Sequence, residues 1–284
     1  MKKLLAVLLA TVMTMSLLTA CGSSKTAETT KETEAAGTTE AAEKTEEATE
    51  TTEAAVSEAL SDGVLTVGTN AEFPPFEYVD DNGEPDGFDI ALIKAIGEKL
   101  GVTVEVENME FASLISSIGS KIDVAIAGMT VTDERKESVD FSDSYYEAVQ
   151  YVILPEGSEI ATAEDLKNKA IGVQLGTTGD FIASDIEGAT VSQYNKAVDA
   201  VNDLINGRVE CVIIDKNPAL VFEGKFEGQI TAVDGAQFDF EPEQYAIAMP
   251  KGDAALVEQV NKALEEIKAD GTFDELVKTY IEAE

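Results

Sequence analysis

Hydrophobic and polar positions follow two alternating periods from about residue 61 to the end of the chain. Short apolar or alternating runs predict strands, as in VTVEVEN at 102–108. Apolar residues three or four apart predict helices, most clearly at 88–101, where Ile90, Ile93 and Ile96 share one face before Gly101. The same patterns predict further strands at 64–70, 122–128, 145–155, 171–177, 209–215 and 244–251, and further helices at 111–120, 163–169, 179–186, 196–207, 253–271 and 273–284.

The order of these elements indicates the fold class. Strands alternate with helices, and several strands are apolar throughout, which is typical of parallel sheets covered by helices on both faces. LISSIGSKIDVAIAG at 114–128 and DLINGRVECVIID at 203–215 also resemble each other, since both pass from a helix through glycine and a basic residue to an apolar strand. We therefore expect an α/β protein with two similar lobes and a ligand between them, where the strand ends meet.

The first 60 residues have a different character. Lys2 and Lys3 precede an apolar stretch within residues 1–20, as in a signal peptide, and hydroxyl residues dilute that stretch below what a membrane helix needs. The stretch ends in LTAC, which resembles the lipobox of bacterial lipoproteins, so Cys21 is expected to carry a lipid. An ordinary cleavage site is the alternative. Residues 21–60, rich in Thr, Glu and Ala, predict a disordered tether behind that anchor.

Charge and composition exclude several functions. The chain has 55 acidic and 20 basic residues, a net charge of −35, so we expect no nucleic-acid partner and no attraction to anionic lipid. Histidine is absent, which removes triad hydrolases and histidine-based zinc sites, and no cofactor or metal is predicted. If Cys21 is lipidated, Cys211 is the only other thiol, so we expect no intramolecular disulfide and interpret Cys211 as a small buried hydrophobe.

Arg135 is one of only two arginines in the chain. Thr132 is the expected N-cap of a helix whose first turn holds Asp133 and Glu134, which puts Arg135 at the third helical position. A cation there opposes the helix dipole by roughly 0.3–1 kcal/mol. Either the neighbouring acids compensate on the surface, or the guanidinium fork holds an anionic ligand. The second arginine, Arg208, lies at a helix end, where positive charge suits the dipole, and no site role is expected for it.

Three further groups of residues are candidates for the site. The turn in QLGTTGD offers Thr177 or Thr178 as a helix N-cap, which either only caps the helix or also binds an anion; it lacks the pattern of a P-loop. Phe73 and Phe76 flank two prolines and are either a core plug or a wall that stacks on a ligand. Asp215 ends the apolar run CVIID and either caps a local turn or faces the cleft to receive a cation.

The chain resembles the solute-binding proteins (family 3 type) of polar amino-acid ABC importers in motifs that occur in the same order: TNAEFPPFEY, GFDIALIKAIGEKLG, ASLISSIGSKIDVAIAGMTVTDERKESVDFSDSYYEA, QLGTTGD, INGRVECVIID and IKADGTFDELVKTY. This resemblance implies a two-lobed periplasmic-binding-protein-like fold of type II, in which each lobe is a mostly parallel sheet flanked by helices and two hinge strands connect the lobes. The expected boundaries are 61–148 and 249–284 for lobe 1, 154–244 for lobe 2, and hinges near 149–153 and 245–248.

The resemblance also implies a site for one amino acid. Arg135 resembles the arginine that binds the ligand α-carboxylate, together with the backbone N–H groups of Thr130 and Thr178. Asp215 resembles the acid that binds the α-ammonium, together with the carbonyl of Ala127 and the hydroxyl of Thr130.

The remaining positions concern the ligand side chain. Phe73 and Phe76 resemble the aromatic residues that pack on it. Asn70 stands where several relatives carry aspartate, and Ala127 and Gly128 stand where some relatives carry paired serines. We therefore expect a polar amino acid with a basic, amide-bearing or cystine-like side chain. The full set of expected ligand-binding residues is Asn70, Phe73, Phe76, Ala127, Gly128, Thr130, Arg135, Thr177, Thr178 and Asp215.

The expected function is a monomeric substrate-binding lipoprotein, anchored on the outer side of the cell membrane, that delivers an amino acid to ABC permease subunits. The length of the tether suggests a Gram-positive cell surface. A dehydratase-like enzyme on the same fold is an alternative, but zwitterion binding already explains the charged cleft residues and leaves no general acid or base. A ligand-sensing lobe is the other alternative, and a sensor is expected to continue into a membrane helix and a signalling domain.

Overall fold

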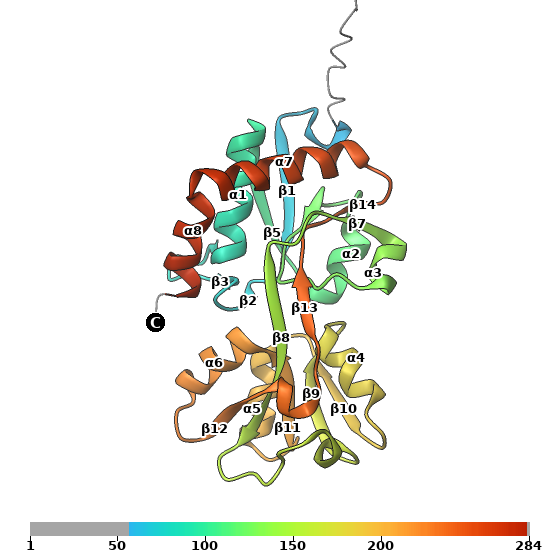
Figure 1. The fold of residues 1–284 in the computed structure, drawn as a ribbon, viewed down its shortest axis with the longest axis vertical. Helices are drawn as coiled ribbons and strands as arrows, with labels where there is room; N and C mark the ends of the chain where they lie inside the picture. Colours follow the sequence, from blue (N-terminus) through green and yellow to red (C-terminus); the bar gives the residue numbers. More distant parts are fainter. Residues whose placement is uncertain (1–56, 283–284) are drawn as a thin grey trace, which may run out of the picture. The chain divides into compact units, whose positions relative to one another are not determined.

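In the computed structural model, which describes residues 57–282, two central sheets define two α/β lobes (Figure 1). The predicted signal peptide, Cys21 and the tether as far as residue 56 lie outside the described residues. Helices flank both sheets, so the expected fold class is confirmed. Within residues 57–282, no helix combines the length and the apolar character that crossing a membrane requires.

Lobe 1 is built on a mixed five-stranded sheet. From one edge to the other its strands are β5 (Thr103–Asn108), β1 (Val64–Thr69), β6 (Val124–Ala125), β14 (Ala248–Pro250) and β7 (Val139–Phe141). β1 is parallel to β5 and β6, and β14 is antiparallel to β6 and β7. The lobe also contains α1 (Phe88–Leu100), α2 (Leu114–Ser117), α3 (Asp133–Ser138), α7 (Ala254–Asp270), α8 (Thr272–Leu276), and a small sheet of β2 (Glu72–Phe73), β3 (Glu77–Val79) and β4 (Pro85–Asp86).

The helix α1 forms where the hydrophobic spacing predicts it. Ile90, Ile93 and Ile96 are fully buried, and Gly101 ends the helix with a left-handed backbone (φ 72°). The buried face packs against β5 and α7, and each isoleucine contributes roughly 1.5–3 kcal/mol relative to an exposed position. This packing fixes the start of α1, and with it Asp89 in the first turn, behind the pocket described below.

Lobe 2 is built on a second mixed sheet. Its strands are, in order, β10 (Thr190–Tyr194), β9 (Ala170–Gln174), β11 (Cys211–Asp215), β8 (Tyr146–Pro155) and β12 (Ile230–Asp234). β9 is parallel to β10 and β11, whereas β8 is antiparallel to β11 and β12. The helices of this lobe are α4 (Thr178–Asp185), α5 (Ala197–Ile205) and α6 (Lys216–Lys225). Cys211 is fully buried in β11, as interpreted from the sequence, and burial raises the pKa of its thiol to about 12.

Two antiparallel strands connect the lobes. β8 pairs with β13 (Pro242–Tyr245) over residues 146–149 and joins the lobe 2 sheet from Gln150 onward. Figure 1 shows both strands running between the lobes. The connecting segments are therefore 146–149 and 242–245, earlier in each strand than the hinges expected near 149–153 and 245–248. The bending motion itself stays a prediction.

The described part of lobe 1 begins at Ser57, earlier than the expected boundary at residue 61. The Ser57 hydroxyl donates to Asp253 Oδ2 (2.6 Å) at the start of α7. The short helix η1 (Glu58–Leu60) follows, and Leu60 is buried in the core of the lobe. Residues 57–60 thus belong to lobe 1 rather than to the tether, because Leu60 supplies an apolar side chain that the lobe buries.

Several other elements differ from the prediction. The expected strand 122–128 pairs as a ladder only at Val124–Ala125, and the expected strand 244–251 is divided between β13 and β14. The strands β10 and β12 and the helix α6 were not predicted. The helix α6 was missed for two reasons. Its apolar residues do not form one stripe, and its sequence contains Pro218, which is typical of a loop. Proline is nevertheless compatible with the first turn of a helix, where Pro218 lies.

Candidate functional site

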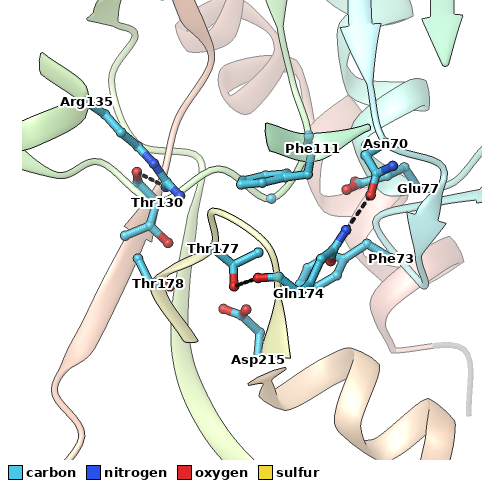
Figure 2. Close-up of a pocket in the computed structure, with 12 residues that line it drawn as sticks. Asn70, Phe73, Glu77, Phe111, Thr130, Arg135, Gln174, Thr177, Thr178 and Asp215 are labelled. Atoms are coloured by element: carbon cyan, nitrogen blue, oxygen red, sulfur yellow. Dashed lines mark hydrogen bonds between the residues drawn. The ribbon is translucent and has the colours of Figure 1, made fainter. Parts of the chain in front are cut away.

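One pocket brings residues of both lobes together (Figure 2). Nine of the ten expected ligand-binding residues line it, and their roles in binding stay predictions. The lining residues are Asn70, Phe73, Glu77, Phe111, Ala127, Gly128, Thr130, Arg135, Gln174, Thr177, Thr178 and Asp215.

Arg135 reaches the pocket from a capped helix start, as its spacing predicts. The hydroxyl of Thr132 accepts a hydrogen bond from the Arg135 N–H (3.1 Å), so α3 begins at Asp133. The guanidinium points away from the surface and donates to the carbonyls of Thr130 (2.6 Å) and Gly176 (3.0 Å). Since Gly176 belongs to lobe 2, the second bond joins the lobes.

The surroundings of Arg135 show whether neighbouring acids balance its charge or whether it is free to bind an anionic ligand. Its side chain is 5% exposed, and burial lowers the pKa of the guanidinium even though Glu243 and Asp215 favour its charge. Asp133 pairs with Lys136 instead (3.5 Å), and no described carboxylate forms an ion pair with Arg135. The interpretation in which neighbouring acids balance the charge of Arg135 on the surface is therefore wrong. Arg135 is a buried cation that faces the pocket and forms no ion pair with a described residue.

Asp215 ends β11 and lines the pocket. Although it occupies the N-cap position of α6, its side chain makes no capping bond and instead accepts a hydrogen bond from the Tyr245 hydroxyl (2.5 Å). Burial, and then the charge of Glu243, raise the pKa of Asp215 to about 7. Of the two sequence interpretations, the structure favours the carboxyl that faces the cleft.

Glu243, on the connecting strand β13, was not predicted from the sequence. Its Oε2 accepts hydrogen bonds from the hydroxyls of Thr130 and Thr178 (2.8 Å for Thr178), which come from different lobes. This carboxylate therefore supplies negative charge beside Arg135 and joins the lobes through two threonines.

The turn before α4 has the expected form. Gly176 adopts a left-handed backbone (φ 78°), and Thr177 is the N-cap, accepting from the N–H of Asp180 (3.3 Å). Thr178 is the first helical residue, and both threonines line the pocket.

The opposite side of the pocket is polar and holds residues that the sequence analysis missed. Figure 2 shows Glu77 and Asn70 across the pocket from Arg135. Gln174 donates to Asn70 Oδ1 (2.8 Å), which joins the lobes again, and Asn70 donates to the carbonyl of Met109 (2.8 Å). Glu77 is fully buried, and neither of its carboxyl oxygens has a hydrogen-bond partner among the described residues.

The two phenylalanines flanking the prolines have different positions. Phe73 lines the pocket, whereas Phe76 is 1% exposed and does not. The Phe76 ring packs edge-on against Tyr146 (4.9 Å between centroids) and Tyr245 (5.3 Å). Phe76 is therefore a core residue behind the pocket wall, which corrects its expected role. Phe111, whose ring centroid lies 5.4 Å from the Arg135 guanidinium carbon, is the second aromatic wall.

Gly128 lies between Phe73 and Tyr245, where only a residue without a side chain fits. Its backbone is left-handed (φ 51°), and a Cβ atom there would lie 3.0 Å from the Phe73 ring and 3.3 Å from Tyr245. A serine at this position would be strained and would displace Phe73.

Chemically, the pocket can neutralise charges of both signs but offers no metal site. The described part of the chain contains no cluster of three or more acidic, histidine or cysteine residues able to hold a metal ion.

Comparisons with known proteins agree with this architecture. Residues 65–283 match the family model of bacterial extracellular solute-binding proteins, family 3. The chain is 35% identical to the arginine-binding extracellular protein ArtP of Bacillus subtilis, over 78% of this chain and 87% of that protein. It is 33% identical to a probable histidine-binding protein of Neisseria gonorrhoeae, over 81% and 88%.

A solved structure of an ancestral arginine-binding protein bound to arginine superposes with a TM-score of 0.72 at 43% identity, covering 77% of this chain and 98% of that one. The fold is thus the two-lobed periplasmic-binding-protein fold of type II. The family consists of binding proteins rather than enzymes, which removes the dehydratase alternative. This chain belongs to the bacterial extracellular solute-binding proteins of family 3.

Proposed function

We propose that this protein is the extracytoplasmic substrate-binding lipoprotein of an ABC importer, which captures an L-amino acid with a cationic side chain, arginine above all, and delivers it to membrane permease subunits. The observation that carries this proposal is the distribution of charge in one small pocket. Arg135 lies on one side, the carboxyl of Asp215 lies near the middle, and the buried carboxyl of Glu77 lies on the far side (Figure 2).

The backbone groups of an α-amino acid fit the first two charges. The α-carboxylate would pair with the Arg135 guanidinium and accept from the N–H groups of Thr130 and Thr178. The α-ammonium would donate to Asp215, to the carbonyl of Ala127 and to the Thr130 hydroxyl. A zwitterion would then satisfy the buried charges that have no ion partner among the described residues.

The ligand side chain would extend between Phe73 and Phe111 towards Glu77. An extended guanidinium stacks well on aromatic rings and binds carboxylates through its planar fork. The neutral amide of Asn70 lies at the same end of the pocket, where it offers a further polar contact. The likeness to the arginine-binding and histidine-binding proteins supports a cationic side chain.

A thermal-shift screen against the twenty amino acids, cystine and citrulline tests the proposal. L-Arginine should give the largest rise in melting temperature, because a ligand that binds only the folded state stabilises it by about 2.7 kcal/mol at a hundredfold excess over Kd. L-Lysine should follow, and D-arginine should give no shift. If no amino acid shifts the transition, the proposed function fails, and a largest shift with glutamine or cystine would reassign the side-chain class.

The membrane anchor is a separate part of the proposal and depends on Cys21, which lies outside the described residues. Cys21→Ser should release the protein from the membrane fraction or leave an unprocessed precursor, because serine cannot carry the thioether-linked lipid. Cys211→Ala is the matched control and should stay membrane-bound, since that thiol is buried in β11. Fractionation with immunoblotting measures both, and a processed, membrane-bound Cys21→Ser protein would contradict the anchor.

A further inference from the structure

Two fully buried carboxyl groups lie together, one lining the pocket and the other behind it. Glu77 comes from β3 and Asp89 from the first turn of α1. Asp89 Oδ2 accepts hydrogen bonds from the Gly128 N–H (2.8 Å) and the Tyr145 hydroxyl (2.8 Å). Asp89 Oδ1 and both oxygens of Glu77 have no donor among the described residues. Three buried acceptor atoms without a donor are costly unless something supplies a hydrogen.

A single proton held between the two carboxyls satisfies two of these three atoms, because the protonated oxygen becomes a donor and an oxygen of the other carboxyl accepts from it. Burial raises the pKa of Glu77 well above its ordinary value, and the neighbouring Asp89 raises it further. Burial also raises the pKa of Asp89, to about 6, but its bonds from Gly128 and Tyr145 favour its ionised form. The proton therefore sits on Glu77, which faces the pocket, and donates to Asp89 behind it.

The other charged and titratable groups around the pair do not remove the need for this proton. Asp215, at the end of β11, adds negative charge near Glu77, and the pKa of Tyr145 is raised by burial and by both carboxyls, so its hydroxyl stays neutral. Arg135 is the only cation that lines the pocket in the described residues, and it lies on the opposite side, bonded to two carbonyls. No ion pair of the described part of the chain includes Glu77 or Asp89.

We propose that Glu77 holds this proton in the ligand-free protein and gives it up when a cationic side chain enters, so that Glu77 adapts its charge to the ligand. The only bond that breaks is the O–H bond of Glu77; the proton passes to the solvent, and the remaining carboxylate pairs with the guanidinium. A neutral side chain with an amide or urea N–H group can instead donate to the other oxygen of the protonated Glu77, and no proton leaves. The inference rests on the proposed function and adds that one site serves two ligand classes.

The direction of the pH dependence follows from this exchange. Below the pKa of Glu77 in the ligand-free protein, the affinity for arginine should rise by about tenfold per pH unit relative to a neutral analogue, because one proton is released per cation bound. Above that pKa, Glu77 is already ionised and the two affinities should change in parallel. Lower pH therefore favours the neutral analogue.

L-Citrulline is the matched probe, because it has nearly the shape of arginine with a neutral urea in place of the guanidinium. Asp215 also has a raised pKa, about 7, and can release a proton when the α-ammonium arrives. Both ligands carry that ammonium, so the difference between them reports Glu77 alone.

Calorimetric titration of the full folded protein near pH 6, in two buffers with different ionisation enthalpies, counts the released protons. Arginine should release about one proton more than citrulline. Glu77→Gln should remove the difference, and Asp89→Asn should reduce it, because without a second carboxyl the pKa of Glu77 falls. Glu107→Gln, an exposed change on β5, should leave it intact.

The outcomes separate the two proposals. If arginine binds and releases as many protons as citrulline, the proton on Glu77 is refuted while the binding function stands. If arginine does not bind at all, the proposed function fails and this inference fails with it. The comparison of the two ligands on the wild-type protein distinguishes these outcomes even if a variant does not fold.

Discussion

Arg135→Ala is expected to weaken arginine binding by about 2–5 kcal/mol, which corresponds to roughly 30- to 5,000-fold in Kd. The loss is large because the ligand α-carboxylate would be buried without its partner. Arg135→Lys keeps the charge but loses the planar fork that also holds the carbonyls of Thr130 and Gly176, so it should weaken binding as well. Calorimetric titration with L-arginine measures both variants.

Arg208→Ala is the matched control for Arg135. Its guanidinium is exposed on lobe 2 and pairs with Asp203, away from the pocket. This variant should bind within about twofold of the wild type, because exposed ion pairs contribute little. Chemical denaturation of all three variants confirms that they are folded. If Arg135→Ala binds L-arginine within a few-fold of the wild-type affinity, the assignment of Arg135 to the ligand α-carboxylate is wrong.

Asp215→Asn should affect binding and folding in opposite directions. Binding should fall by about 2–5 kcal/mol, because the ligand ammonium loses its anionic partner. The ligand-free protein should become more stable at neutral pH. In the folded state the pKa of Asp215 is raised to about 7 by burial and by Glu243, so the unfolded chain loses this proton at lower pH than the folded one. Stability is therefore lost as pH rises from about 4 to about 7, and asparagine, which does not ionise, avoids that loss.

The expected gain is on the order of a few kcal/mol above pH 7 and disappears near pH 4, where aspartate is protonated in both states. Asparagine can still accept the hydrogen bond from Tyr245. Thermal melts of the ligand-free protein across this pH range measure the effect, with the exposed Asp81→Asn as control. A variant that is less stable than wild type at pH 7.5 would show that the surroundings of Asp215 do not raise its pKa.

The parts of the fold that could be predicted are those in which the buried residues recur along the sequence at the spacing of a helix or a strand. The faces of α1 and α7 and the apolar strands β9 and β11 are buried where the sequence indicates. Prediction failed where tertiary contacts decide. Ile126, Ala127 and Gly128 continue an apolar run and are buried, but they lie beyond the end of β6, and Ala127 and Gly128 line the pocket.

The site shows the same division. Arg135 and Asp215 could be found because an arginine is rare in this chain and because an acid at the end of an apolar strand is unusual. Glu77 and Glu243 could not be distinguished among 55 acidic residues. Their burial and contacts depend on segments distant in sequence, such as α1 for Glu77 and the turn before α4 for Glu243. Phe76 was expected to contact the ligand but lies in the core behind the pocket wall, for the same reason.

The attachment of Ser57 to the start of α7 has a mechanical consequence. This contact lies at the end of lobe 1 that faces away from lobe 2 (Figure 1), and the described chain passes from lobe 1 to lobe 2 and back through β8 and β13. Tension along the preceding chain would therefore load lobe 1 alone. A rotation of lobe 2 about the connecting strands would do no work against that tension, so a pull on the proposed anchor would not hold the binding site open or shut.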